Sequence, residues 1–308
     1  MMKKQLTTYI ALFALAVLFT SCGEYNRVLK STDYNYKYAY AKDAFEKGKY
    51  TQAYTILEDI VTVFKGTDKA EESLYLLAMS YYENKDYMTS GSYFKTYYQH
   101  YPKGQFAELA RFYCGYGYYL DSPETQLDQS GTVKAIEELQ NFLDYFPKSD
   151  KVSIAQNAIF ELQDKLVLKE LENATLYYNL GTYMGNNYQS AVIVAKNAIK
   201  DYPYSKYKEQ LEMLVLKSRY QEALQSTDER KEDRFRDVID EYYSFINDFP
   251  ESNNRHEADN IFKIASKHVK NWCLIMAYCP SPEAPTNKKP TNKFYINNII
   301  LFDKANGL

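Results

Sequence analysis

The residue in this sequence whose surroundings most clearly indicate chemistry is Cys22. Two lysines near the start of the chain precede an uncharged, mostly apolar run over residues 9–19, and the small residues Thr20 and Ser21 follow it. A basic region, an apolar region and small residues before a cut are the layout of an export signal. The run is shorter than the stretch of about 20 apolar residues that a transmembrane helix needs. Residues 1–21 are therefore predicted to be a signal peptide that is removed.

The sequence before Cys22 resembles a bacterial lipobox, although Phe19 stands where leucine is usual. On this resemblance Cys22 is acylated and becomes the first residue of a lipoprotein; the alternative is an ordinary thiol. One acyl chain holds a protein only marginally on a membrane, whereas several chains hold it firmly. Gly23 rather than an aspartate follows the cysteine, which favours the outer membrane. Residues 22–33 are predicted to be a lipidated tether, and the covalent lipid on Cys22 is the only added group that we expect.

The other cysteines and the acidic residues do not suggest a catalytic or metal site. Cys114 falls in a helical stretch, whereas Cys273 and Cys279 lie near the C-terminus and could pair in an oxidising compartment. The three histidines are scattered along the chain. Acidic pairs such as 71–72 and 137–138 are predicted on the solvent faces of helices, whereas glycoside hydrolysis needs two carboxylates in a rigid cleft. We expect neither an enzyme nor a metal site.

Charge and tyrosine content narrow the class of partner. The chain has 37 basic and 40 acidic residues and a net charge of -3, whereas a nucleic-acid-binding protein needs a concentrated basic surface. Nucleic acid is therefore not expected as a partner. The 33 tyrosines among 308 residues combine large apolar rings with hydroxyls that need hydrogen-bond partners. Most of them are predicted to pack between helices.

An internal repeat in the sequence indicates the helices from which the fold is built. One apolar pattern, with steps of 3, 4, 3, 1 and 3 residues, recurs five times and forms one face of a helix. An aromatic residue ends each copy, and proline follows it in four of the five. Proline cannot continue a helix and disfavours helical backbone in the residue before it, so each copy should end there. The copies begin at Tyr50, Tyr87, Thr132, Tyr188 and Phe235.

Before each copy stand a polar turn and a second helical pattern, so the unit is helix, turn, helix and proline. This unit resembles the tetratricopeptide repeat, which has a period of about 34 residues. The prediction is an all-α fold, a right-handed superhelix of about five tetratricopeptide-like helix pairs with a C-terminal capping helix, over residues 34–271. The copies are spaced more widely than the bare repeat, so insertions are predicted at 121–131 and 167–173. Residues 272–308 contain four closely spaced prolines and are predicted to be an irregular, disordered tail.

Residues 38–64, 106–130 and 135–149, together with the lipobox and the five pairs, resemble the BamD family of outer-membrane lipoproteins. A wide insertion between the helices of the third repeat adds to this resemblance. It implies a lipid-anchored protein on the periplasmic face of the outer membrane that belongs to the β-barrel assembly machinery. Its C-terminal repeats would bind the periplasmic domains of a BamA-like barrel protein, and its N-terminal repeats would receive unfolded outer-membrane proteins.

Two sets of residues are candidates for these contacts. Aromatic concavities suit the aromatic ends of extended precursor chains. Candidates for the precursor groove, from the first helix of each pair, are Tyr36, Tyr40, Tyr75, Tyr82, Tyr113 and Tyr116. Candidates for the BamA-like partner, from a basic and aromatic region near the fourth and fifth repeats, are Arg219, Tyr220, Arg230 and Arg234.

Two other classes of binding lipoprotein remain open at this point. Glycan- or nutrient-capturing lipoproteins also contain tetratricopeptide pairs, but they are far longer and carry large insertions that hold the sugar. Cell-envelope scaffolds with the same repeats usually carry an N-terminal coiled coil, which this sequence lacks. The assembly-factor interpretation is therefore preferred.

Overall fold

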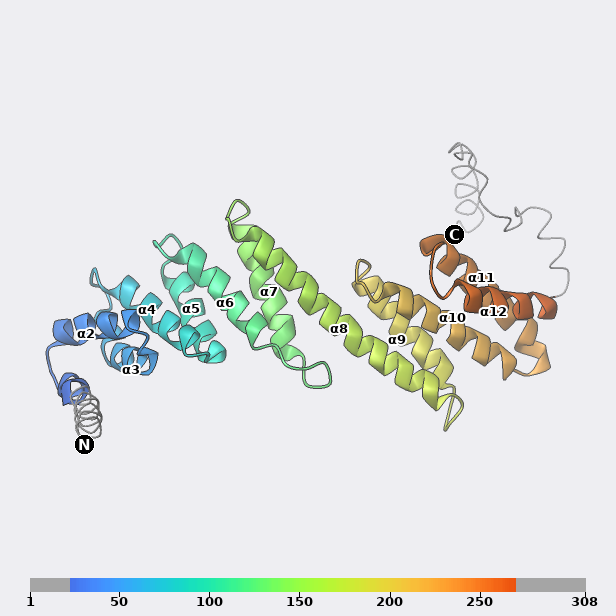
Figure 1. Ribbon diagram of the computed structural model, residues 1–308, viewed down its shortest axis with the longest axis horizontal. Helices are drawn as coiled ribbons and strands as arrows, with labels where there is room; N and C mark the ends of the chain where they lie inside the picture. Colours follow the sequence, from blue (N-terminus) through green and yellow to red (C-terminus); the bar gives the residue numbers. More distant parts are fainter. Residues whose placement is uncertain (1–22, 270–308) are drawn as a thin grey trace, which may run out of the picture.

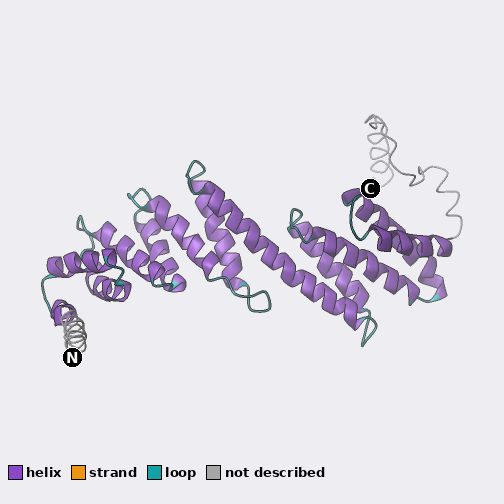
Figure 2. Cartoon of the chain, viewed as in Figure 1, coloured by secondary structure: helices purple, strands orange, loops and turns teal. Residues whose placement is uncertain are grey.

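The computed structural model describes residues 23–269, and the regular elements in that part of the chain are helices arranged in a row (Figure 1, Figure 2). Residues 23–29 form a short helix. The others are α2 (Tyr34–Glu46), α3 (Tyr50–Val61), α4 (Ala70–Glu83), α5 (Tyr87–His100), α6 (Ala107–Leu120), α7 (Ser130–Tyr145), α8 (Val152–Leu180), α9 (Asn187–Asp201), α10 (Lys208–Leu224), α11 (Asp228–Asp248) and α12 (Arg255–His268).

The helices form the five predicted pairs, because the five repeat copies coincide with α3, α5, α7, α9 and α11. Each pair packs on the next along the chain, and α12 packs on α11 as the predicted capping helix. Four second helices end at the aromatic residue before a proline, where φ lies between -123° and -133°. Proline displaces the residue before it from the helical region, which explains this common end. The predicted tetratricopeptide-like fold class is confirmed.

The turn after the proline is fastened to the first helix of its own pair. The hydroxyl of Ser149 donates a hydrogen bond to Glu108 of α6, with an oxygen–oxygen distance of 2.6 Å. The same bond joins Ser205 to Asp164 of α8, at 2.6 Å, and Ser252 to Glu209 of α10, at 2.5 Å. Hydrogen bonds to ionised carboxylates are stronger than neutral ones. Each of these three serines therefore helps to close one helix pair.

Of the two predicted insertions between helices, the structure contains the first as a loop and contradicts the second. Residues 121–129 connect α6 to α7 as a loop, near the predicted insertion at 121–131. The second predicted insertion, at 167–173, lies within the 29-residue helix α8. This segment is rich in leucine, lysine and glutamate, which favour helix, and Val167 and Ala174 are buried. The extra residues therefore lengthen a helix and do not form a loop. Gly181, at φ +58°, follows the end of α8 in a conformation that favours glycine.

The segment that follows Cys22 is packed against the first helix pair. Val28 is fully buried among residues of α2 and α3, and the ring of Tyr25 lies 6.4 Å from that of Tyr40. The region predicted to be a tether therefore contacts the folded body through Tyr25 and Val28. Cys22 itself, the signal peptide over 1–21, and the predicted tail from 272 to 308 lie outside the described residues.

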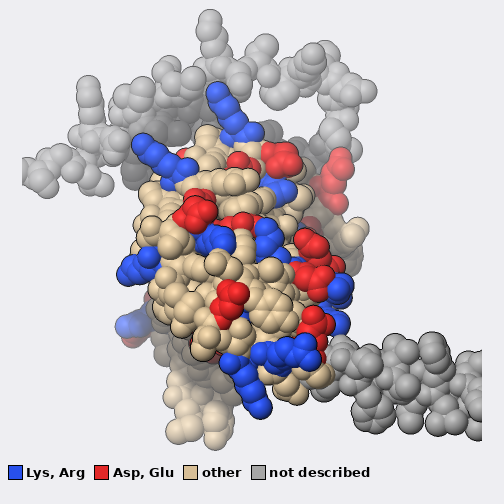
Figure 3. Space-filling model, turned by 90° about the vertical axis from the view of Figure 1, so that its left-hand side faces the viewer, with Lys and Arg blue, Asp and Glu red and all other residues tan. Residues whose placement is uncertain are grey.

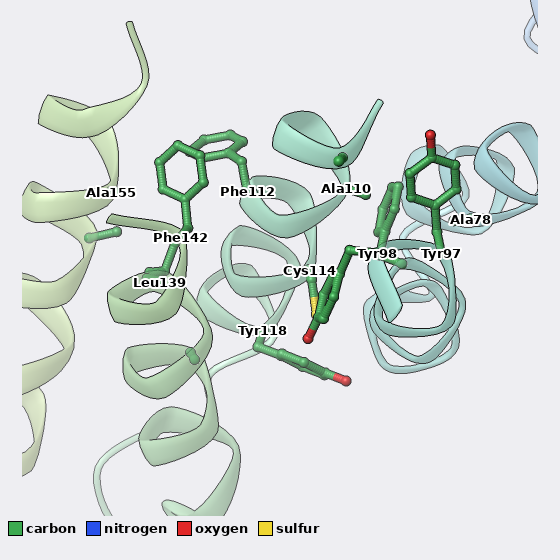
Figure 4. Close-up of a cluster of buried hydrophobic side chains, with 14 of the residues drawn as sticks. Ala78, Tyr97, Tyr98, Ala110, Phe112, Cys114, Tyr118, Leu139, Phe142 and Ala155 are labelled. Carbon is green, nitrogen blue, oxygen red and sulfur yellow. The ribbon is translucent and has the colours of Figure 1, made fainter. Parts of the chain in front are cut away.

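Helix α8 joins two lobes, which we call the N-terminal lobe (α2–α7) and the C-terminal lobe (α9–α12). The first half of α8 packs on α7, and Ala155 and Leu162 belong to a core that continues back to α4. The second half packs on α9 and α10 through Val167 and Ala174. The core of the N-terminal lobe is rich in aromatic rings, among them the fully buried Phe142 (Figure 4).

Candidate binding surfaces

Most of the hydrogen-bonded tyrosines in the N-terminal lobe join neighbouring helices through a carboxylate. Burial of a tyrosine ring places its hydroxyl near the helix surface, where it needs a hydrogen-bond partner. These hydroxyls donate to carboxylates in the pairs Tyr38–Glu72, Tyr81–Glu58, Tyr93–Glu58, Tyr97–Glu71, Tyr98–Glu138 and Tyr119–Glu161. Six of the 33 tyrosines thus join helices through their hydroxyls.

Glu138 corrects the expectation that the acidic pair at 137–138 faces solvent. Its side chain is buried, and its carboxylate accepts hydrogen bonds from Lys95, at 2.9 Å, and from Tyr98, at 2.8 Å. A buried charge is tolerated when it is both paired and hydrogen-bonded. Sequence periodicity missed this site because its partners lie 40 and 43 residues earlier in the chain.

Four of the six candidate precursor-binding tyrosines come together on α4 and α6, and we call them the aromatic surface: Tyr75, Tyr82, Tyr113 and Tyr116. The centroid of the Tyr82 ring lies 4.9 Å from that of Tyr113. Tyr75 stacks on Phe106 at 4.2 Å, and Tyr116 stacks on Phe112 at 5.1 Å. All four side chains are half-buried against the core of the N-terminal lobe. The rings are thus held in place while part of each remains accessible.

The hydroxyls of the aromatic surface differ from those that bond carboxylates. Within residues 23–269 these four hydroxyls form no hydrogen bond, and none is enclosed away from solvent. Burial of the rings, the largest cause, raises the pKa of Tyr75 and of Tyr82 above its usual value. Both phenols are therefore neutral at physiological pH. A neutral phenol both donates and accepts hydrogen bonds, so this surface combines apolar contact area with unfilled hydrogen-bonding capacity.

The other two candidates, Tyr36 and Tyr40, lie on α2 and do not join the aromatic surface. The side chain of Tyr36 is 37% exposed. Tyr40 packs with the core of the first pair and donates its hydroxyl to Gln52, at 2.9 Å. Its role in packing is therefore accounted for within the first pair. Tyr36 remains an accessible aromatic residue near the N-terminal end.

The candidate partner-binding residues at the other end gather around a buried glutamate. Glu222 is only 5% exposed and lies within 3.1 Å of Arg219 and 3.4 Å of Arg234. Asn186 donates a third contact to Glu222, at 2.7 Å. Two arginine charges therefore meet one carboxylate charge, and the cluster remains cationic. Sequence reasoning missed Glu222, because only its i+3 spacing from Arg219 indicated a partner.

The remaining two partner candidates are placed differently. Arg230 is exposed in the first turn of α11. The ring of Tyr220 packs toward Phe235 in the core of the C-terminal lobe, with ring centroids 6.5 Å apart. Arg230 is therefore the residue of this set most available to a partner.

Other features of the described residues give no sign of catalysis. No group of three or more potential metal-ligating side chains occurs within residues 23–269. In the same part of the chain no helix has the length and apolar character to cross a bilayer. Figure 3 shows basic and acidic side chains intermixed on the end that carries the N-terminal lobe, with no continuous basic surface. Burial raises the pKa of the Cys114 thiol to about 12, so this cysteine is an unreactive core residue.

Comparisons with known proteins address the family. A family model described as an outer membrane lipoprotein, YfiO, matches residues 31–215. No curated protein matches the chain. One similar solved structure is a putative kinesin light chain from Podosopora anserina with nearly identical TPR-like repeats. It shares 13% sequence identity with a TM-score of 0.29, over 75% of this chain and 92% of that one.

Proposed function

Because the chain belongs to the YfiO family of outer membrane lipoproteins, we propose that it is a scaffold of the β-barrel assembly machinery. In this proposal acylated Cys22 anchors it to the periplasmic face of the outer membrane. The N-terminal lobe receives unfolded outer-membrane proteins, and the C-terminal lobe binds the periplasmic domains of a BamA-like barrel protein. The protein performs no catalysis itself.

The observation that carries the precursor role is the aromatic surface on α4 and α6. A precursor is an extended chain whose backbone amides and aromatic side chains are not yet paired. Preformed rings supply contact area at low conformational cost, and the free hydroxyls can bond the backbone of such a chain. Because phenol hydroxyls contact backbone groups irrespective of side-chain identity, the same surface would accept many precursors.

The partner role rests on the cationic cluster around Glu222. Its two arginines are held in place by a buried carboxylate, so their remaining hydrogen-bond donors are oriented before a partner arrives. Arginine donors suit carboxylates of another protein particularly well because of their planar geometry. Arg230 adds one more exposed basic side chain on α11, where acidic residues flank it. We therefore expect an acidic contact on the BamA-like partner.

Affinity purification of the full lipoprotein from its own membranes is the main test. The expected result is co-purification of a large barrel protein with periplasmic domains. Arg230→Glu should weaken this recovery. The control Arg236→Glu, at another exposed position of the same helix, should not. Recovery of sugar transporters alone would reject the assembly role and favour a nutrient-capturing lipoprotein.

The precursor surface has a separate test that leaves the fold intact. Tyr82→Phe combined with Tyr113→Phe removes two free hydroxyls and keeps both rings. Binding of a peptide that copies the C-terminal strand of an outer-membrane barrel should weaken by about tenfold, consistent with the loss of one or two hydrogen bonds. The control is Tyr183→Phe, a change at an exposed position in the loop between α8 and α9. Equal affinity of both variants would show that the hydroxyls of Tyr82 and Tyr113 do not bind the peptide.

The anchor is tested by Cys22→Ala. Without an acylated cysteine the protein should leave the membrane fraction, because in this proposal the acyl chains are what hold it there. Fractionation with outer membranes that is unchanged in this variant would contradict the lipid anchor. This result would not bear on the partner or precursor tests.

A further inference from the structure

A groove along the second half of α8 is not used by the proposed function. Two adjoining concavities of about 390 and 370 Å³ form it, and both are lined by Leu171, Thr175 and Asn179. Leu176 of α8 lines one of them, and Met213 of α10 lines the other. The side chain of Leu176 is 58% exposed. The groove is therefore a partly apolar surface along the second half of α8.

The length of α8 explains why this face has no partner in the helix row. In the second, third and fifth pairs the first helix packs on the second helix of the preceding pair. Helix α8 has 29 residues and α7 has 16, so α8 is longer by about 20 Å at 1.5 Å per residue. Only its first half shares a core with α7. Beyond that point the face that a preceding helix would cover remains open.

The 121–129 loop borders the groove but does not fill it. Gln126 of this loop donates to Glu172, at 3.3 Å, and Lys169 donates to the carbonyl of Leu127, at 2.8 Å. Charges at the groove are few and opposite, with Glu172 on one side and Lys217 on the other. An uncharged, apolar occupant therefore fits this surface better than a strongly charged one.

The chain itself contains a segment with this chemistry. Residues 294–302 read FYINNIILF and include neither a charge nor a proline. A run of this kind promotes aggregation when it is left uncovered. Its two central asparagines match a groove that also contains the amides of Asn179, Gln210 and Asn254. The segment thus needs a cover and resembles the groove in polarity.

The segment is also within reach of the groove. Asn254, which lines the groove, directly precedes α12, and the described chain ends at Val269 just after that helix. A helix of 14 residues is about 21 Å long. The 25 steps from Val269 to Phe294 span up to about 80 Å when extended.

We propose that residues 294–302 bind in the α8 groove of their own chain. The segment would cover Leu171 and Leu176 and would bridge the second half of α8 to α10. It would then act as a cover that completes the row of helices where the long helix leaves a gap. This inference concerns a surface separate from the aromatic surface and from the cationic cluster, so it stands or falls independently of the proposed function.

Photocrosslinking in the full chain tests this proposal. A photoreactive phenylalanine replaces Leu176 in the groove or, as a matched control, Ile193, which is also half exposed but lies on α9 outside the groove. Mass spectrometry should identify crosslinks from position 176, but not from 193, to residues 294–302. Ile300→Asp places a charge in the segment without altering residues 23–269 and should reduce the crosslink yield by about tenfold.

Isotope labelling separates the possible occupants. Labelled and unlabelled chains are mixed before irradiation, and crosslinks that join peptides of one label support binding within a chain. Crosslinks that join both labels would overturn the proposal in favour of a second copy, and crosslinks to another protein or to lipid would overturn it in favour of that partner. Hydrogen exchange provides a second readout, since the amides of residues 168–180 should exchange about tenfold faster in Ile300→Asp. Equal exchange would also overturn it.

Discussion

The two lobes use the same helix pair but stabilise it differently. Six of the seven tyrosine–carboxylate hydrogen bonds named here begin in the N-terminal lobe, and Tyr242–Asp259 is the one in the C-terminal lobe. Ion pairs join helices in both lobes, for example Lys95–Glu138 in the N-terminal lobe and Lys208–Asp248 in the C-terminal lobe. The difference between the lobes is therefore the larger share of tyrosine hydroxyls at the helix contacts of the N-terminal lobe.

The extent of the family match adds to this contrast. The matched residues 31–215 include the whole N-terminal lobe, α8 and α9, and end within α10. The buried Glu222 and all of α11 and α12 lie beyond it. The aromatic surface therefore lies within the residues that the family model matches, whereas part of the cationic cluster proposed for the partner lies outside them. Substitutions in each lobe can show whether the two lobes are stabilised separately.

Large-to-small changes in the two cores should have the largest effect. Phe142→Ala in the N-terminal lobe and Phe245→Ala in the C-terminal lobe remove fully buried rings and should each lower the free energy of unfolding by about 3–5 kcal/mol. Hydrogen exchange should accelerate mainly in the lobe that carries the change. Equal acceleration in both lobes for either variant would show that they form one cooperative unit.

A proline in the middle of α8 should have the next largest effect on the free energy of unfolding. Lys169→Pro removes a helical hydrogen bond and should lower the free energy of unfolding by about 3 kcal/mol. Lys169→Ala is the matched control, because it removes only the side-chain contact with Leu127. Denaturant unfolding should show two separated transitions for the proline variant. A single transition, as in the control, would mean that α8 is not needed to couple the lobes.

Glu212 makes the stability of the C-terminal lobe depend on pH. Burial raises the pKa of Glu212 to about 7 despite Lys208, and one of its oxygens has no hydrogen-bond partner. The folded state binds this proton more tightly than the unfolded state, whose value is near 4.5. The stability that this tighter proton binding contributes is fully present below about pH 4.5 and is lost as the pH rises to about 7.

Glu212→Gln should remove that loss. At pH 8 the variant should be more stable than the original protein by about 2 kcal/mol, and near pH 4.5 the difference should be close to zero. The measurement is the free energy of unfolding at both pH values, with the exposed Glu229→Gln as control. A stability difference that is independent of pH would show that Glu212 is ionised normally in the folded protein.

The smallest expected effects come from removing one tyrosine hydroxyl in each lobe. Tyr98→Phe removes the hydrogen bond to the buried Glu138 and should cost about 1.5 kcal/mol. Tyr242→Phe removes a bond of the same 2.8 Å length to Asp259, whose side chain is about half exposed to water. Its cost should be below about 1 kcal/mol, since water can replace the lost donor. Thermal denaturation of both variants measures the difference, and a larger loss for Tyr242→Phe would reverse the comparison.

The sequence allowed the second helix of each pair to be predicted closely, because a fixed apolar spacing ends at an aromatic–proline step. The path of residues 167–173 could not be predicted in this way, since an added length of good helix-forming residues fits either a loop or a longer helix. The burial of Glu138 and Glu222 also escaped prediction, because their partners are distant in sequence. The convergence of Tyr82 and Tyr113 depends on how α4 and α6 pack, which helical periodicity alone does not determine.

The buried Val28 has a consequence for how the protein stands on a membrane. If Cys22 is acylated as we propose, only residues 23–27 separate the lipid from a side chain that is fixed in the first helix pair. The body then has little freedom to pivot, and its distance from the bilayer is set by the stack of helices and not by slack in the chain. A partner of the last repeats would have to meet them at one defined height.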